Sequence, residues 1–114
     1  MPYINAKISK KLTADVKTAL KAALGEAITK IPGKSETYLM VCIDDGCDMW
    51  LAGNNSSDHA FFDVRILGTA SGDSFSAMTG EICRVCRDLL GISPENVYVA
   101  YSEYEHWGWN GKNF

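Results

Sequence analysis

The chain begins Met1-Pro2-Tyr3-Ile4-Asn5-Ala6-Lys7-Ile8, a stretch that sets a proline directly before a run typical of a β-strand. A methionine followed by proline favours removal of the initiator methionine, which would leave Pro2 with a free secondary amine. An amine at the end of a strand is positioned by the fold, unlike a frayed terminus. It could act as a general base if burial or a nearby cation lowered its pKa towards neutral pH. A Met-Pro start alone is usually an ordinary terminus, so the remaining sequence has to separate these two interpretations.

The composition is that of one small globular domain covering residues 1–114. Hydrophobic residues make up 46% of the 114 residues, enough for a real if small core. The net charge of −3 argues against a nucleic-acid-binding surface, and the longest apolar runs are far too short to span a membrane. No secretory signal is recognisable at the N-terminus, so we expect a cytoplasmic protein with reduced thiols. The cysteines are Cys42, Cys47, Cys83 and Cys86.

The first half of the chain has the pattern of a β-α-β unit. After a strand at residues 3–8, apolar residues recur at helical spacing between positions 16 and 31. Thr13 is a plausible N-cap of this helix, and Pro32-Gly33 stops it. Residues 38–43 form a second strand, whose almost continuous hydrophobicity predicts burial on both faces.

The second half repeats this order. Residues 60–67 read as a strand, and residues 97–102 read as the last strand. Between them lies a second amphipathic helix, which Asp73 or Ser74 caps and Gly91 ends.

Two β-α-β units, with a short edge strand at residues 49–52 between them, predict an α+β fold. Because such crossovers are right-handed, both helices should cover the same face of one four-stranded mixed sheet. The opposite face then stays uncovered, although the strands carry too many aromatic residues to leave in water. A symmetric oligomer is the natural way to cover that face. The aromatic residues concerned are Tyr3, Phe61, Phe62, Tyr98 and Tyr101.

Three features occur together in this chain: Met1-Pro2 before a strand, the doubled β-α-β order, and a tail that reads Gly108-Trp109-Asn110 and ends in Phe114. The segment ISPENVYV at residues 92–99 and the spacing from Lys34 to Tyr38 add to the pattern. Over essentially its whole length the chain resembles the macrophage migration inhibitory factor family of the tautomerase superfamily. The resemblance implies a homotrimer whose three sheets enclose a central channel. It also implies keto–enol isomerisation of small aromatic acids such as phenylpyruvate, or of dopachrome-like substrates, with no metal or cofactor.

The resemblance implies roles for individual residues. Pro2 matches the catalytic base, which moves a proton between the carbon next to the carbonyl and the oxygen. Lys34 matches a lysine whose charge binds a substrate carboxylate or enolate oxygen and lowers the pKa of the proline. Without the resemblance, Lys34 would be a solvated charge and the aromatic positions would be packing residues. The matched substrate-binding positions are Leu67 through its backbone, Tyr98 from the neighbouring subunit, and Tyr38, Trp109 and Phe114 as pocket aromatics.

The sequence departs from the family pattern in two places. Ala100 stands where the best-known members carry an asparagine that binds the substrate carboxylate across the subunit boundary, which predicts a different substrate preference. The Cys-x-x-Cys position of the cytokine members is filled here by residues 59–62, so thiol-redox activity is not expected. The other Cys-x-x-Cys, Cys83 to Cys86, lies inside the predicted second helix without a thioredoxin-like turn, and we interpret both cysteines as packing residues.

Other kinds of site have weaker support. His59 and His106 lack neighbouring ligand residues, so no metal site is expected. Residues 68–72 before the second helix could bind an anion through backbone N–H groups, although a plain strand–helix turn explains them as well. The leading hypothesis is therefore a cofactor-free keto–enol tautomerase that uses Pro2. The alternative is a cytokine-like signalling protein that keeps the fold, leaves the cell by a non-classical route and binds a receptor with little or no catalysis.

Overall fold

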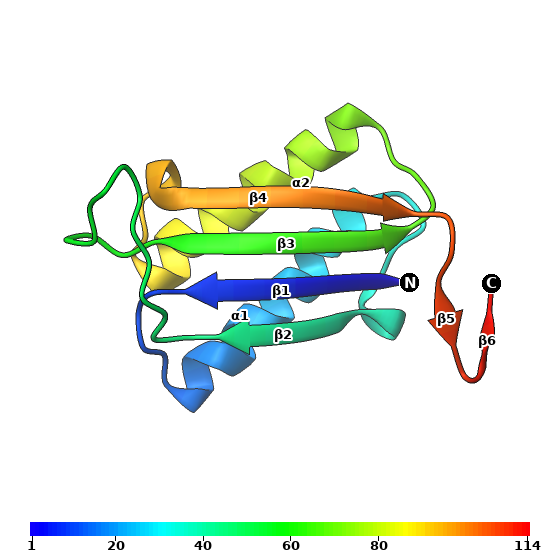
Figure 1. The fold of residues 1–114 in the computed structure, drawn as a ribbon, viewed down its shortest axis with the longest axis horizontal. Coiled ribbons are helices and arrows are strands. Elements are labelled where there is room, and N and C mark those ends of the chain that lie inside the picture. The colour runs from blue at the N-terminus through cyan, green and yellow to red at the C-terminus, as the bar shows by residue number, and fades with distance from the viewer.

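The computed structural model describes all 114 residues and contains one four-stranded mixed sheet with both long helices against the same face (Figure 1). The strand order is β2-β1-β3-β4. The first strand, β1 (Pro2–Ile8), runs parallel to β2 (Met40–Asp44) and antiparallel to β3 (Ala60–Leu67). The last strand, β4 (Val97–Tyr104), runs parallel to β3. The predicted α+β class and doubled β-α-β order are confirmed.

The helices begin and end at residues whose side chains or backbone angles suit these positions. Helix α1 (Ala14–Ala27) begins after Thr13, whose hydroxyl accepts a hydrogen bond from the Val16 amide, and continues as the 3-10 turn η1 (Ile28–Lys30). Thr13 was predicted as this cap. The capping oxygen satisfies one of the amides that the first turn leaves without an intrahelical partner.

The second helix is capped two or three residues earlier than predicted. Helix α2 (Gly72–Val85) is preceded by Ser71, whose hydroxyl accepts from the Ser74 amide, so the prediction of Asp73 or Ser74 as cap was wrong. Ser71 has the extended backbone that a capping residue adopts, whereas Asp73 already lies in the first turn. The helix continues as the π-helical segment η3 (Cys86–Leu90) and ends at Gly91, where a φ of 67° favours glycine.

The core lies between the sheet and the helices. Alternate residues of β1 and β3 point to the helices and are fully buried, including Ile4 and Phe62. Tyr101 on β4 also faces the helices: its ring lies 4.4 Å from that of Phe75, and its hydroxyl donates to the Phe75 carbonyl at 3.0 Å. Phe62 and Tyr101 were therefore wrongly assigned to the open face. Since side chains alternate along a strand, Phe61 and Phe62 cannot both face the same way.

The open face of the sheet is both polar and aromatic. Lys7 forms an ion pair with Asp44 at 3.1 Å, and the Asn5 side chain donates to the same carboxylate. Further along, the rings of Phe61 and Tyr98 meet edge to face with centroids 6.5 Å apart. The helices leave this face uncovered, as predicted, but its charged pairs make it less apolar than the aromatic content alone suggested.

Strand β2 is the edge of the sheet, so the prediction that this strand is buried on both faces was wrong. Met40 is 67% exposed, while Val41 and Ile43 pack against the core. A continuous apolar run does not distinguish an interior strand from an edge strand. The short edge strand predicted at residues 49–52 is also absent, because only a single bridge between Leu51 and Asn54 forms there.

The C-terminal tail folds back beside the start of β1 as a small hairpin, which the sequence analysis did not predict (Figure 1). Its strands are β5 (Gly108–Trp109) and β6 (Lys112–Asn113). Asn110 and Gly111 both have positive φ, of 54° and 83°, as a type I′ turn requires. Single 3-10 turns, η2 (Glu36–Tyr38) and η4 (Pro94–Asn96), precede β2 and β4. None of the helices has the length and apolar character needed to cross a membrane.

Candidate active site

Pro2 is the first residue of a central strand. It is buried, and in the ladder it lies opposite Ile66 of β3, while Tyr3 lies between Met40 of β2 and Arg65 of β3. Proline has no backbone N–H, so at the first position of a strand it removes no ladder hydrogen bond. The start of the chain is therefore held on both sides by neighbouring strands.

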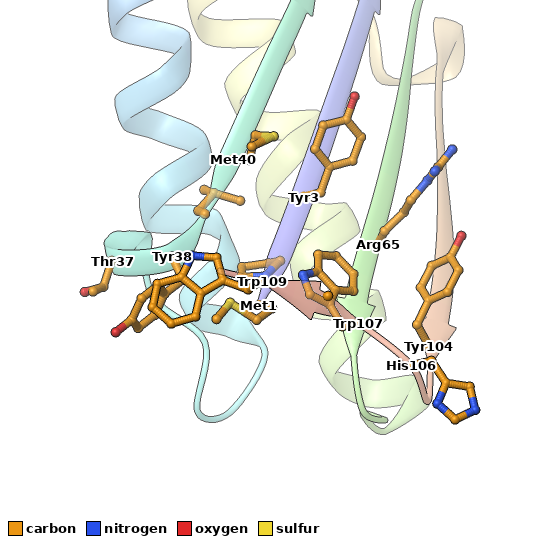
Figure 2. A pocket seen from close by; sticks show the side chains of 13 residues that line it. Met1, Tyr3, Thr37, Tyr38, Met40, Arg65, Tyr104, His106, Trp107 and Trp109 are labelled. Carbon is orange, nitrogen blue, oxygen red and sulfur yellow. The ribbon is translucent and has the colours of Figure 1, made fainter. Parts of the chain in front are cut away.

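A pocket of about 830 Å³ opens beside this strand end (Figure 2). Its walls come from segments far apart in the sequence, which the sheet and the tail hairpin bring together. They consist of residues 1–3, residues 37–40, Arg65, Tyr104 and residues 106–109. This volume lies within the range of small-molecule sites in proteins.

Three of the predicted pocket aromatics lie together at this end of the sheet. The rings of Tyr38 and Trp109 meet edge to face with centroids 5.9 Å apart, and Phe114 stacks on Trp109 at 6.1 Å. Tyr38 and Trp109 line the pocket, whereas Phe114 supports Trp109. The pair Tyr104 and Trp107, also edge to face at 5.9 Å, contributes a second aromatic wall. A flat apolar ligand group fits between such walls.

Leu67 connects the start of the chain to Lys34. The Leu67 amide donates to the Met1 carbonyl at 3.0 Å, and the Leu67 carbonyl accepts from Lys34 Nζ at 2.9 Å. Lys34 follows Gly33, whose φ of 80° allows the chain to turn after α1, and the Lys34 amide donates to Ile31. Pro2, Lys34 and Leu67, predicted from distant parts of the sequence, therefore form one cluster.

This cluster lowers the proton affinity of an amine. Burial, followed by the charge of Lys34 and a hydrogen bond with its side chain, lowers the pKa of the Met1 α-amino group below its ordinary value. Both the loss of solvent and a nearby positive charge disfavour the ammonium form. The position next to Pro2 thus favours a neutral, basic amine.

Tyr98 lies at the other end of the sheet. In the ladder Tyr98 lies opposite Phe61. The β4 residue at the level of Pro2 is Glu103, because Glu103 pairs with Ile66 and Ile66 pairs with Pro2. Tyr98 precedes Glu103 by five residues. At roughly 3.3 Å per residue this separation is about 17 Å, so Tyr98 cannot reach the pocket of its own chain. Its predicted role from a neighbouring subunit stays a prediction.

The sequence analysis missed several residues of the pocket, among them Arg65, Tyr104 and Trp107. The place of Arg65 near the site could have been predicted, since Arg65 lies two residues before Leu67 and side chains two apart share a face of a strand. Tyr104 lies two residues beyond the predicted end of its strand. Trp107 joins the pocket only because the tail folds back, for which the sequence offered no clear signal.

A model of the family described as Macrophage migration inhibitory factor (MIF) matches residues 1–114. The chain belongs to this family. Among solved structures of the family, that of Leishmania major MIF2 is 29% identical, with a TM-score of 0.91 over 100% of this chain and 97% of that one. The homologue from Prochlorococcus marinus is 26% identical, with a TM-score of 0.80 over 98% of each chain.

The MIF fold also appears at lower identity. The MIF-like protein of Entamoeba histolytica is 17% identical, with a TM-score of 0.85 over 99% of this chain and 98% of that one. Among curated proteins none matches the sequence.

The loop before α2 uses its own donors internally. The Ala70 amide donates to a Glu103 carboxylate oxygen at 2.9 Å, and the Ser74 amide donates to Ser71. A side chain of the same molecule thus takes the place of an outside anion, which favours the interpretation of residues 68–72 as a turn.

The cysteine pair in the second helix has the environment of packing residues. Burial raises the pKa of the Cys86 thiol to about 12 and also raises that of Cys83. Both thiols are therefore protonated at neutral pH, and a protonated thiol is a poor nucleophile. No group of three or more His, Cys, Asp and Glu side chains has an arrangement that could hold a metal ion.

We expect this MIF-family protein to reduce insulin disulfides no faster than buffer does, because disulfide exchange requires a thiolate. The measurement is insulin turbidity in the presence of dithiothreitol, with thioredoxin as positive control. Robust reduction that disappears in Cys83→Ser would contradict the packing interpretation of this pair.

Proposed function

We propose that, once Met1 is removed, this protein is a cofactor-independent keto–enol tautomerase of small aromatic keto acids such as phenylpyruvate, with the Pro2 nitrogen as general base. The observation that carries the proposal is the cluster of Pro2, Lys34 and Leu67 beside an apolar pocket, of which only Pro2 lines the wall. Membership of the MIF family supports it. The pocket aromatics would hold the ring of the substrate against the strand end.

Removal of Met1 would change two groups at once. It frees the Pro2 nitrogen from its amide bond, and it takes away the Met1 carbonyl to which the Leu67 amide donates. A half-buried N–H without a partner is unfavourable by roughly 1–3 kcal/mol, so it favours a ligand oxygen at this point. The same cleavage therefore creates a base and a hydrogen-bond donor beside it.

These groups suffice for a proton shuttle. The neutral Pro2 nitrogen removes a proton from the carbon next to the substrate carbonyl. The electrons of that C–H bond form the carbon–carbon double bond, and the carbonyl oxygen becomes an enolate oxygen. The Lys34 ammonium has three donors, only one of which is used by Leu67, so it can stabilise this oxygen together with the Leu67 amide. The proton on Pro2 then passes to the oxygen and gives the enol.

The environment favours the basic form that this step needs. Burial and Lys34 lower the pKa of the Met1 amine, and a Pro2 amine one residue further into the sheet would meet the same two causes. A free proline amine is otherwise too basic to be largely neutral at pH 7. A pKa near neutral is the optimum for a group that must both take and return a proton.

We also propose that the active form is a homotrimer with the sheets around a central channel. Three features of the single chain support this assembly: β2 is an edge strand, the open sheet face has no cover, and Tyr98 is 56% exposed on it. In a trimer Tyr98 could enter the pocket of a neighbour, which the distance within one chain forbids.

The assembly predicts that light scattering gives a mass three times that of the 12.5 kDa chain in dilute solution. The edge strand and the open face are the surfaces that association would bury. A monomer mass at micromolar concentration would contradict the trimer and would exclude Tyr98 from the site.

Inserting an alanine between Met1 and Pro2 should abolish phenylpyruvate turnover, because the free amine would no longer lie at the strand end. Pro2→Gly keeps a terminal amine and should lower turnover by roughly 10²–10⁴-fold, the usual contribution of a positioned acid–base group. Enol formation is followed by ultraviolet absorbance, with intact mass to verify each N-terminus and circular dichroism to verify folding. Turnover that survives the verified insertion would exclude Pro2 as the base.

Lys34→Ala should raise the pH at which kcat/KM reaches half its maximum. Lys34 lowers the pKa of the nearby amine, so without it the inactive ammonium form persists to higher pH. Lys30→Ala, which removes an exposed lysine four residues earlier, is the matched control and should leave the profile in place. An unchanged pH profile in Lys34→Ala would show that burial alone sets the pKa of the base.

A further inference from the structure

Arg65 is the one formally charged side chain in the wall of the pocket, with histidine counted as neutral. It extends from β3 on the open face of the sheet, opposite Tyr3 in the ladder. Figure 2 shows its side chain between Tyr3 and Tyr104. The proton shuttle described above gives Arg65 no role.

The guanidinium group is held in place by two contacts. Its carbon lies 5.7 Å from the centroid of the Tyr3 ring, a cation–π geometry. Its Nε and Nη2 atoms both donate to the same Asp63 oxygen, at 3.2 and 2.9 Å. These contacts fix the direction of a long side chain that would otherwise be free to rotate, so less conformational entropy is lost when a ligand binds.

One edge of the guanidinium group stays free. Arginine has five N–H donors, and only two of them, one on Nε and one on Nη2, have a partner in the protein. Both donors on Nη1 and the second donor on Nη2 are free. The free edge matches the two oxygens of a carboxylate, which arginine binds through two parallel hydrogen bonds. Arg65 can therefore bind an anion without giving up Asp63.

The direction of the side chain says which part of a ligand it can reach. Pro2 lies opposite Ile66, next to Arg65, but the guanidinium group extends back along the strand towards Asp63, whose backbone lies two residues, about 7 Å at roughly 3.3 Å per residue, further from the strand end. A group bound by Arg65 is thus remote from the atoms that Pro2 and Lys34 would hold. The volume of about 830 Å³ leaves room for a ligand longer than phenylpyruvate.

We propose that Arg65 is a specificity residue that binds a second carboxylate at the end of the substrate remote from its keto–enol group, so that the preferred substrates are keto–enol dicarboxylic acids. The identity of the reacting end rests on the proposed tautomerase function. The recognition of the remote carboxylate rests on the pocket and the guanidinium geometry alone. The two can therefore be tested separately.

The test compares two ligands that differ only in the group para to the acetate, 4-carboxyphenylacetate and 4-methylphenylacetate, by isothermal titration calorimetry on protein that begins at Pro2. The wild type should bind the dianion at least about tenfold more tightly, as expected for a charge-assisted hydrogen-bond pair. Arg65→Gln should remove this preference. Arg84→Gln is the matched control, because it removes an arginine that is also paired with acidic residues but lies on α2, outside the pocket, and it should keep the preference.

Equal binding of the two ligands by the wild type, or a preference that survives in Arg65→Gln, would overturn the inference. If Arg65→Gln does not fold by circular dichroism, Arg65→Lys takes its place. Lysine keeps the charge but not the two parallel hydrogen bonds, so the preference should fall severalfold, and an undiminished preference would overturn the role of the free edge.

Phenylpyruvate turnover, measured on the same samples, separates the two proposals. A binding preference without turnover would leave Arg65 as a carboxylate-binding residue and exclude the tautomerase function. Turnover without a binding preference for the dianion would support the tautomerase function and exclude Arg65 as a carboxylate-binding residue. With 4-carboxyphenylpyruvate as substrate, the loss in Arg65→Gln should appear mainly in KM, since the contact is remote from the reacting atoms and is the same before and during reaction.

Discussion

The site depends on one constraint, that the chain starts inside a central strand of the sheet. Chain termini usually fray because few contacts hold them. Here the residues from Tyr3 onwards pair with β2 on one side and β3 on the other, and Ile4, Ala6 and Ile8 are fully buried under the helices. The strand cannot move without opening both ladders and exposing the core. The backbone nitrogen at the start of this strand is consequently held as firmly as a side chain in the interior of the protein.

The surroundings of the strand end follow from this position. The end of β3 must lie beside the start of β1 because the two strands are antiparallel, so Leu67 meets Met1. The turn after α1 leads into β2, the other neighbour of β1, and it brings Lys34 to the Leu67 carbonyl. The tail hairpin then covers the same end with Trp107 and Trp109. One buried strand thus gathers an amine, a cation, a backbone donor and an aromatic wall, and burial makes the amine less basic.

The sequence contained most of the fold but less of the site. The strand at residues 60–67 and the cap at Thr13 follow from period-2 and period-3.6 patterns, which are local properties. The edge position of β2 could not be read from its apolar run, because burial on a second face depends on which strand comes next in space. The alternation of side chains along a strand could have predicted that Phe61 and Phe62 lie on opposite faces of the sheet. Asn110-Gly111 is a hairpin signal, but strands of two residues leave no pattern around it.

Only some of the site residues, likewise, could be predicted from local sequence patterns. Lys34 and Tyr38 could be named only through the resemblance to the MIF family, because a lysine after a helix or an exposed tyrosine has no distinctive pattern of its own. Pro2 was marked as a possible base by the Met-Pro start, but the resemblance was needed to distinguish it from an ordinary terminus. Arg65 could have been suspected from its place two residues before Leu67, but only the register between β1 and β3 shows that it lies beside Tyr3 at the pocket.

In the proposed enzyme, the alternation that separates the core from the open face would also separate catalysis from recognition. The proposed reacting end consists of the strand terminus, the backbone of Leu67 and Lys34, and the first two are fixed by the pairing of β1 with β3. The opposite wall is built from side chains of the open face, among them Tyr3, Met40 and Arg65, which do not belong to the buried core. An exposed ion pair such as Arg65 with Asp63 adds little to stability, so this wall can be exchanged almost without cost to folding. The proposed enzyme could therefore keep one proton-transfer geometry while the residues on the open face determine which acid enters.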